Sequence, residues 1–312
     1  MRNLLGIKVG VIAMLATGGL AQAQLAPSVA PSSTDTSWSF FHPNLYDKGS
    51  PFIRFFREGE WYFSWGGNKE TFARTDIHVS QPSLGNDFTI HGVQGHDEPD
   101  LSGLLKGDFF GPQYNIRIGR FINADRTIAV ELSFDHTKYT ATDGQTANVT
   151  GIIGNAPVNG PRVLDANFFR YLLHNGANHV MTNLVYRKPL LGELNETYSL
   201  AFIGKAGAGI MMPHVDNTIL GNPNDVGSKT PSNFFGIHNG WWQFGGWTSG
   251  VEAGLRYVVW KPFYIELTDK VAYASLWNLN AFQGAVSHGL WMNEVIFSVG
   301  FTYDGASSAG KH

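Results

Sequence analysis

The sequence predicts an all-β protein: an antiparallel transmembrane β-barrel of about eight strands, with short periplasmic turns and long external loops. Three observations predict this fold. Apolar and polar residues alternate along many segments, the connections between those segments alternate in length, and the composition suits strands. With Gly 37, aromatic residues at 13% and charged residues at 15%, the chain resembles one built of strands and tight turns. It has no Cys, so no disulfide supports the fold.

The beginning of the chain predicts export. Arg2 and Lys8 are followed by an apolar stretch and by Ala21-Gln22-Ala23, which is typical of a secretory signal peptide spanning 1–23. Residues 24–57 are interpreted as an N-terminal periplasmic leader or arm. Its Ser- and Pro-rich first part is expected to be disordered, and its aromatic part, 38–57, either lies on the membrane surface or packs on the barrel. The barrel is placed at 58–304 and a C-terminal tail at 305–312.

The alternating pattern is clearest in the segment IAVELSFD. Ile128, Val130 and Leu132 alternate there with Glu131 and Ser133. This is the period of a strand whose two faces meet different surroundings. Similar rows begin at Trp61, Tyr114, Val180, Leu200, Trp247, Phe263 and Val295.

The period alone also fits a soluble sandwich that buries its apolar rows. Two further features favour a membrane barrel, in which the apolar rows face lipid. The polar rows carry opposite charges and small residues, and the apolar rows end in aromatic residues. The connections also alternate: those at 123–126, 190–196 and 260–262 are short, and those at 80–112, 142–176, 213–245 and 278–289 are long. Short periplasmic turns and long external loops are typical of outer-membrane barrels, which places the protein in the cell outer membrane of a Gram-negative bacterium.

An eight-stranded barrel has room inside only for its own side chains. The polar rows are therefore predicted to fill the lumen with a charge network, which argues against a general porin. Its expected members are Glu131, Lys205, Glu252, Arg256, Glu266, Lys270 and Glu294. Asp269 falls instead in a lipid-facing row, where a charge costs about 2 kcal/mol or more at mid-depth. We therefore expect Asp269 near a rim, beside a bulge, or in a different register.

Four segments in chain order, PQYNIRIGRF, FDHTKY, NLVYRKPL and GAGIMMPHVDN, resemble eight-stranded lipid A oxidase-type barrels, a branch of the OmpA/OmpW-like superfamily. The resemblance covers most of 61–303. It implies oxidation of the proximal glucosamine of lipid A, with oxygen and a divalent metal. The closing FSVGFTY resembles the aromatic C-terminal signal of such barrels and implies the barrel-assembly machinery as a partner, although a tail follows it here. The segments 24–57 and 96–111 depart from the family pattern.

The family-like polar positions are His136, Lys138, His214 and Asp216, at the expected external ends of their strands. His136, Lys138 and His214 continue apolar rows to the height of the outer-leaflet phosphates, so they are candidate residues for binding lipopolysaccharide. His136, His214 and Asp216 are the candidate catalytic residues. The alternative is that the basic residues are ordinary rim charges that anchor the barrel.

A second group, His91, His96, Asp97 and Glu98, contains the His and carboxylate ligands that divalent ions accept. Its spacing matches no HExxH motif, and a polar external loop is the alternative interpretation.

Two classes of function remain open. One is a structural barrel, or a barrel that binds lipid or a small apolar ligand, with a plugged lumen. The other is a lipid A-modifying, oxidase-like enzyme that uses a divalent metal at the outer leaflet. A carrier needs an apolar cavity in the upper lumen, whereas an enzyme needs converging His and carboxylate groups. Outer-membrane lipid is the expected partner, and a net charge of −3 provides no basic field for nucleic acid.

Overall fold

The computed structural model describes residues 59–98, 113–224, 226 and 241–305, which belong to one compact unit, Arg54–His312. The predicted signal peptide, the leader at 24–57, residues 99–111 of the inserted segment and the tail beyond Gly305 lie outside the described residues. Among the described residues, no helix has the length and hydropathy needed to cross a membrane.

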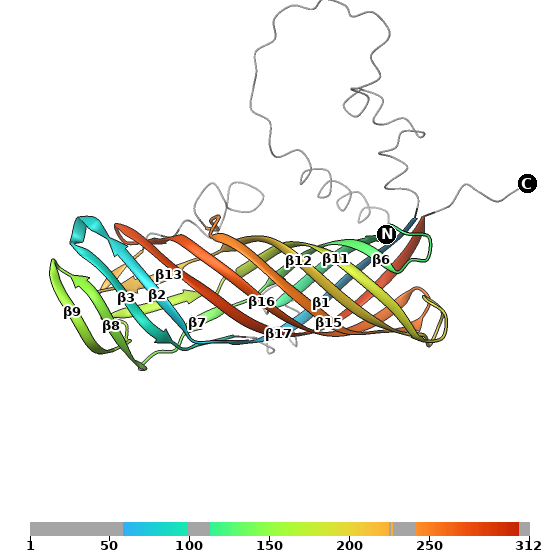
Figure 1. The fold of residues 1–312 in the computed structure, drawn as a ribbon, viewed down its shortest axis with the longest axis horizontal. Helices are drawn as coiled ribbons and strands as arrows, with labels where there is room; N and C mark the ends of the chain where they lie inside the picture. The colour runs from blue at the N-terminus through green and yellow to red at the C-terminus, as the bar shows by residue number, and fades with distance from the viewer. Residues whose placement is uncertain (1–58, 99–112, 225, 227–240, 306–312) are drawn as a thin grey trace, which may run out of the picture. The chain divides into compact units, whose positions relative to one another are not determined.

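Eight antiparallel strands form a closed ring, as Figure 1 shows, and the predicted barrel is thereby confirmed. In ring order they are β1 (Gly59–Phe72), β5 (Tyr114–Phe121), β6 (Ile128–His136), β11 (Ala177–Leu191), β12 (Leu200–Pro213), β15 (Gly246–Trp260), β16 (Phe263–Ala281) and β17 (Gly284–Gly305). The pairing of β17 with β1 closes the ring.

The outer face of the ring is apolar. Its exposed side chains include Val130, Leu132, Leu184, Val251, Leu255, Leu267, Val295, Phe297 and Val299. Aromatic residues border this belt: Trp247, Tyr273 and Trp291 at one end, and Trp260, Phe263 and Tyr303 at the other. On β16, the stretch from Phe263 to Tyr273 covers about 25 Å of membrane depth, at a rise of about 3.3 Å per residue and a tilt of about 40°. The ring therefore spans a membrane with its apolar rows toward lipid.

Short turns join the strands at one end of the ring, which we call the short-turn end. The turn between β5 and β6 is held by the side chain of Asn123, whose Oδ1 accepts hydrogen bonds from the backbone N–H groups of Thr127 and Ile128, both at 2.9 Å. Arg126 adopts a positive φ of 56° to complete this turn. A side-chain cap of this kind lets two long strands reverse without a longer loop.

At the opposite end, the long connections form further strands. They are β2 (Thr75–Gln81), β3 (Asn86–Val93), β4 (Gly95–His96), β7 (Tyr139–Ala141), β8 (Thr146–Ile153), β9 (Ala156–Val163), β10 (Phe169–Leu173), β13 (Asp216–Ile219) and β14 (Asn222–Pro223), with one 3-10 turn at Pro82–Leu84. The distal part of β17 pairs with β2, which continues the barrel sheet through β3, β8 and β9. The other strands form a five-stranded sheet, β14-β13-β10-β7-β4. We call these strands, with the distal ends of β16 and β17, the cap (Figure 1).

Two sequence expectations about this end need correction. The segments predicted as long loops contain most of the cap strands, and 278–289 is no loop at all. There β16 and β17 continue as a hairpin up to the pair Ala281 and Gly284. In this stretch a register shift lies between Leu276 and Leu279, and the inward residues of β17, such as Val286 and Leu290, are apolar because they join the core of the cap.

The two sheets of the cap enclose an apolar core. It includes Ile77, Val79, Phe88, Ile90 and Val149 from one sheet and Phe169, Tyr171, Leu173 and Ile219 from the other. Phe72, Ala272 and Met292, from strands of the ring, belong to the same cluster. The apolar core of the cap therefore continues into the adjoining end of the barrel interior.

The hairpin of β8 and β9 ends the larger sheet. Its turn residues, Gly154 and Asn155, both have positive φ, 59° and 63°, as a type I′ turn requires. With Ile153 and Ala156 as the pair that flanks this two-residue turn, the backbone N atoms of Pro157 and Pro161 fall on the free side of β9. Proline has no N–H to donate, so this edge is protected against pairing with another strand.

Candidate functional site

The barrel interior contains a network of ion pairs contributed by six of the eight ring strands. Its members are Arg117, Glu131, Asp135, Lys205, Glu252, Arg256, Glu266, Lys270 and Glu294, and none is more than 6% exposed. The inward rows place these side chains on one face of each strand, and closure of the ring brings the rows together. All seven residues expected from the sequence lie in this network.

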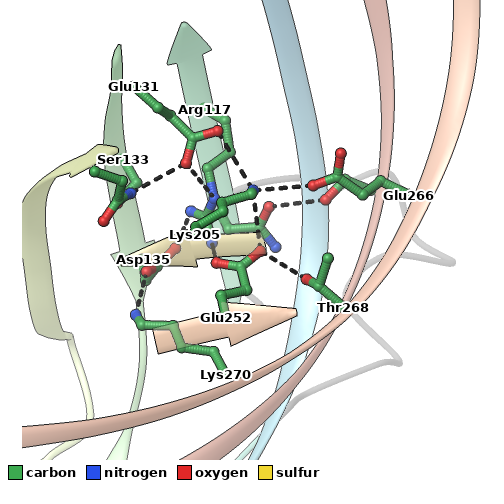
Figure 2. A network of polar contacts seen from close by, with 12 residues as sticks. Arg117, Glu131, Ser133, Asp135, Lys205, Glu252, Glu266, Thr268 and Lys270 are labelled. Carbon is green, nitrogen blue, oxygen red and sulfur yellow. Dashed lines mark hydrogen bonds and ion pairs between the residues drawn. The ribbon is translucent and has the colours of Figure 1, made fainter. Parts of the chain in front are cut away.

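Lys205 stands at the centre of the network, as Figure 2 shows. Its Nζ lies 2.9 Å from Glu266 Oε1, 3.0 Å from Glu252 Oε1 and 3.3 Å from Glu131 Oε2. Glu252 also accepts a hydrogen bond from Thr268 Oγ1 at 2.7 Å. One ammonium group thus joins carboxylates from three strands, which satisfies each of its three donors.

A second part of the network crosses the lumen. Lys270 Nζ lies 2.6 Å from Asp135 Oδ2 and 3.0 Å from Glu294 Oε2. Arg117 forms an ion pair with Asp135 and, at 3.5 Å, with Glu252. Lys270 and Asp135, and likewise Arg117 and Glu252, come from opposite sides of the ring, so these pairs brace the barrel as well as filling it.

Arg256 is held between two aromatic rings. Its Cζ lies 4.6 Å from the ring centre of Tyr62 and 4.1 Å from that of Tyr264, and its Nε donates to Glu266 Oε2 at 2.7 Å. Gly119 and Gly300 make room for these rings, because a Cβ at either position would lie within 2.5 Å of Tyr62 or Tyr264. Cation–π contacts in a desolvated site are among the stronger ones.

The short-turn end is closed by Arg187. Its guanidinium lies 3.8 Å above the ring of Phe121, and it donates to Asn195 Oδ1 at 2.8 Å and to Glu60 Oε1 at 3.1 Å. Arg126 also contacts Glu60, at 3.2 Å. The lumen is therefore closed below the ion-pair network by this group and above it by the apolar core of the cap.

Sequence reasoning missed part of this arrangement. Arg117 and Asp135 belong to the network, and their positions in the inward rows were the available signal. The partner of Arg256 is Glu266 on the neighbouring strand, whereas Glu252, four residues before Arg256 on β15, pairs with Lys205. Alternation identifies the inward face but not which side chains meet across the ring.

The expected lipid-facing positions of His136, Lys138 and His214 need correction. The three residues are 7%, 9% and 2% exposed, so they lie beneath other groups and not on the lipid-facing surface. His136 stacks on Tyr114 with ring centres 4.9 Å apart, and its Nδ1 lies 2.7 Å from Asn178 Oδ1. Of the three, only His136 lies in a strand, at the outward position expected; Lys138 and His214 lie beyond the ends of β6 and β12. Whether neighbouring side chains cover such a residue depends on the tertiary structure.

His214 lies beside His174, a residue that the sequence did not single out. Their ring centres are 5.8 Å apart, and burial lowers the pKa of both imidazoles, which favours the neutral form. His214 Nδ1 is 2.8 Å from the carbonyl oxygen of Trp241. Asp216, the expected third member, lies 3.9 Å from Arg170. The catalytic candidates His136, His214 and Asp216 thus each have a different polar partner.

Each of the four candidate metal ligands also contacts a polar partner of its own. His91 lies 2.9 Å from Asp76, whose carboxyl pKa this hydrogen bond lowers, and His96 lies 3.2 Å from Thr142. Asp97 contacts Lys69, and Glu98 accepts from Thr140 at 2.9 Å. In the described part of the chain, no three His, Cys, Asp or Glu side chains form a group that could hold a metal ion. The described residues therefore do not bring His91, His96, Asp97 and Glu98 together as one set of ligands.

The cap carries a shallow groove on its surface, with a volume of about 490 Å³. Polar atoms contribute most of its exposed walls. The residues that line it are Ile153, Ala156, Pro157, Val158, Asn159, Arg162, Phe168 and Leu220. The groove is open to solvent and lies beside the protected edge of β9.

No family model matches the chain, and no curated protein matches it. Among solved structures it is similar to the outer membrane protein AlkL in lipid bilayers, with 11% identity and a TM-score of 0.34, over 81% of this chain and 94% of that one. It is also similar to Neisserial surface protein A, with 10% identity and a TM-score of 0.31, over 79% and 100% of the two chains. For the outer membrane protein OprG from Pseudomonas aeruginosa the values are 10% and 0.31, over 80% and 97%.

All of these are outer-membrane β-barrel proteins. At such identities and TM-scores the similarity supports no statement about activity, and the assignment to a membrane barrel rests on the strand pairing and on the apolar outer face.

Proposed function

We propose that the protein is a structural outer-membrane β-barrel with a plugged lumen, which anchors the cap at the cell surface of a Gram-negative bacterium. The signal peptide predicted at 1–23 would deliver it there. The closed interior supports this proposal above all. Every member of the ion-pair network is at most 6% exposed, so solvent has no access to the lumen at that level.

The filled lumen also argues against a ligand-binding cavity inside the barrel. A carrier would need an apolar cavity in the upper lumen, and that region is filled by buried side chains such as Phe72, Met211 and Met292. A small ligand with an apolar part would instead be bound on the cap, where Phe168 and Leu220 line part of the groove. Binding at the cap surface is compatible with a rigid anchor and requires no passage through the barrel.

Planar-bilayer recordings of the purified protein test the proposal. We expect no steady conductance from the parent protein. The combined variant Lys205→Ala with Arg256→Ala, which removes two large cations from the plug, should conduct if it folds and serves as the positive control. Steady conductance of the parent would overturn the plugged-barrel proposal.

Lipid A from strains with and without the protein tests the enzymatic alternative. Under the proposed function the two lipid A preparations have identical masses. A gain of one oxygen atom that depends on the protein would favour the oxidase-like alternative.

A further inference from the structure

Asp269 faces lipid in the middle of a regular ladder. Its side chain is exposed on the outer face of β16, where it pairs with Ala253 on one side and Val295 on the other. The expectation that Asp269 lies near a rim, beside a bulge or in a different register is therefore wrong, because the regular ladder keeps it in the lipid-facing row. At a rise of about 3.3 Å per residue and a tilt of about 40°, it is about 10 Å inside the aromatic boundary at Tyr273. An ionisable group at such a depth is costly and calls for a partner.

The chain itself satisfies Asp269 only in part. Asn293 Nδ2 donates to its Oδ1 at 2.5 Å. Within the described ranges, no cationic side chain forms an ion pair with it. One carboxylate oxygen therefore still faces the hydrocarbon without a donor from the described residues.

A basic residue, Lys69, lies at the position that corresponds to Asp269 on the other side of β17. Val295 pairs with Asp269 on β16 and with Lys69 on β1, so the two charged residues flank it in the same row. The side chain of Lys69 is 68% exposed, and its contact with Asp97 is long, at 3.4 Å. The outer surface of β16, β17 and β1 thus carries an acid and a base at equal distances from its central strand.

We propose that this surface binds a second copy of the chain about a two-fold axis that runs along the membrane normal and passes by Val295. Rotation by 180° about such an axis places β16 of one copy against β1 of the other. Asp269 of each copy then meets Lys69 of the partner copy, and the contact occurs twice, as in any isologous interface.

The reach of Lys69 and the packing agree with this arrangement. Lys69 contacts Asp97, next to the cap strand β4, and its long side chain can extend along the interface to reach the carboxylate of Asp269. Gly67, the preceding outward residue of β1, lets the two backbones approach. In lipid, association depends on polar pairs and close packing, because the acyl chains are as apolar as the exposed Val and Phe residues.

Cysteine cross-linking in membranes tests the position of the axis, and the natural absence of Cys makes single-cysteine variants unambiguous. Val295→Cys, on the axis, should give a disulfide-linked dimer upon mild oxidation. Leu184→Cys, on β11 at the opposite side of the ring, is the matched control and should remain monomeric. Absence of the Val295→Cys dimer, or equal cross-linking at both positions, overturns the proposal.

Charge exchange tests the ion pairs. Asp269→Asn and Lys69→Gln should each weaken association in bilayers by about tenfold, measured by energy transfer between labelled copies. The double variant Asp269→Lys with Lys69→Asp should restore association, because each charge again meets its opposite. The heat-resistant folded band on gels verifies that each barrel is intact. Unchanged association in both single variants, or no recovery in the folded double variant, contradicts the assigned pairs.

Discussion

Lys270 reaches across the barrel to Asp135, and their charged groups are separated by 2.6 Å although β16 and β6 lie on opposite sides of the ring. No pair of neighbouring strands could create this contact. It forms only once the ring has closed, so it couples closure of the barrel to neutralisation of its interior. Breaking one such pair leaves a buried charge without a partner, which costs much more than losing an exposed ion pair.

The pair Lys270 and Glu294 is suited to a double-mutant cycle, since Lys270 forms the one ion pair that Glu294 has among the described residues. Lys270→Met should lower the free energy of unfolding by about 3–5 kcal/mol, because the buried Glu294 loses its cation and Asp135 keeps only Arg117. Lys270→Met with Glu294→Gln should recover part of that loss. Urea unfolding in lipid vesicles measures both values.

Lys261→Met is the control for this cycle. Lys261 pairs with Glu196 at 2.8 Å on the surface of the short-turn end, and both side chains are exposed. We expect the urea unfolding midpoint of Lys261→Met to equal that of the parent protein. If Lys270→Met also behaves like the parent, the interior is hydrated and the network is not a plug.

Acid should loosen the cap through His288. Burial lowers its pKa to about 4, from 6.5 for the free imidazole, and its Nε2 lies 2.9 Å from Tyr171 Oη in the apolar core. The folded state therefore binds a proton less readily than the unfolded state. The contribution of His288 to the free energy of unfolding is fully present above about pH 6.5. It is lost as the pH falls toward 4, and the loss is about 3 kcal/mol at most.

Protease digestion of the cap in vesicles, measured between pH 7 and pH 4, checks this dependence. Digestion should accelerate across that range in the parent and less steeply in His288→Phe. The neutral forms of His174 and His214 contribute with the same sign, so some dependence remains in the variant. A parent whose cap is equally resistant at both limits contradicts the prediction.

The free edge of β9 should become adhesive when its prolines are removed. Pro157→Thr with Pro161→Thr restores two N–H groups on the unpaired side of the strand, and unpaired edges bind other strands. We expect aggregation after detergent dilution, measured by light scattering. Asn159→Thr, on the same edge but with its N–H already present, should scatter like the parent; equal scattering from all three proteins would refute the role given to the prolines.

The orientation of the barrel is open to direct labelling. Asn155, in the turn of the cap hairpin, is expected outside the cell, and Ala124, at the short-turn end, is expected in the periplasm. A membrane-impermeant thiol reagent applied to intact cells should modify Asn155→Cys and spare Ala124→Cys. The reverse pattern would invert the topology.

The sequence by itself determined the ring and its faces. Each strand alternates with a period of two, so Val130 and Leu132 are assigned to lipid and Glu131 to the interior without knowledge of any partner. The lengths of the connections likewise identified the short-turn end. A tight turn depends on local residues such as Asn123, so its position follows from the sequence. The position of Asp269 on the lipid-facing row also followed from parity alone.

Only the tertiary structure decided which of these side chains meet. Arg256 pairs with Glu266, and Lys270 with Asp135, because closure of the ring sets the distances across the lumen, and no local pattern encodes them. The same holds for His136, whose row was correct but whose burial depends on residues distant in sequence, and for His214, which lies beyond the end of β12. The cap was missed although strands such as β2 and β3 alternate regularly, because their apolar rows face the core between the two cap sheets, and that core exists only in the folded protein.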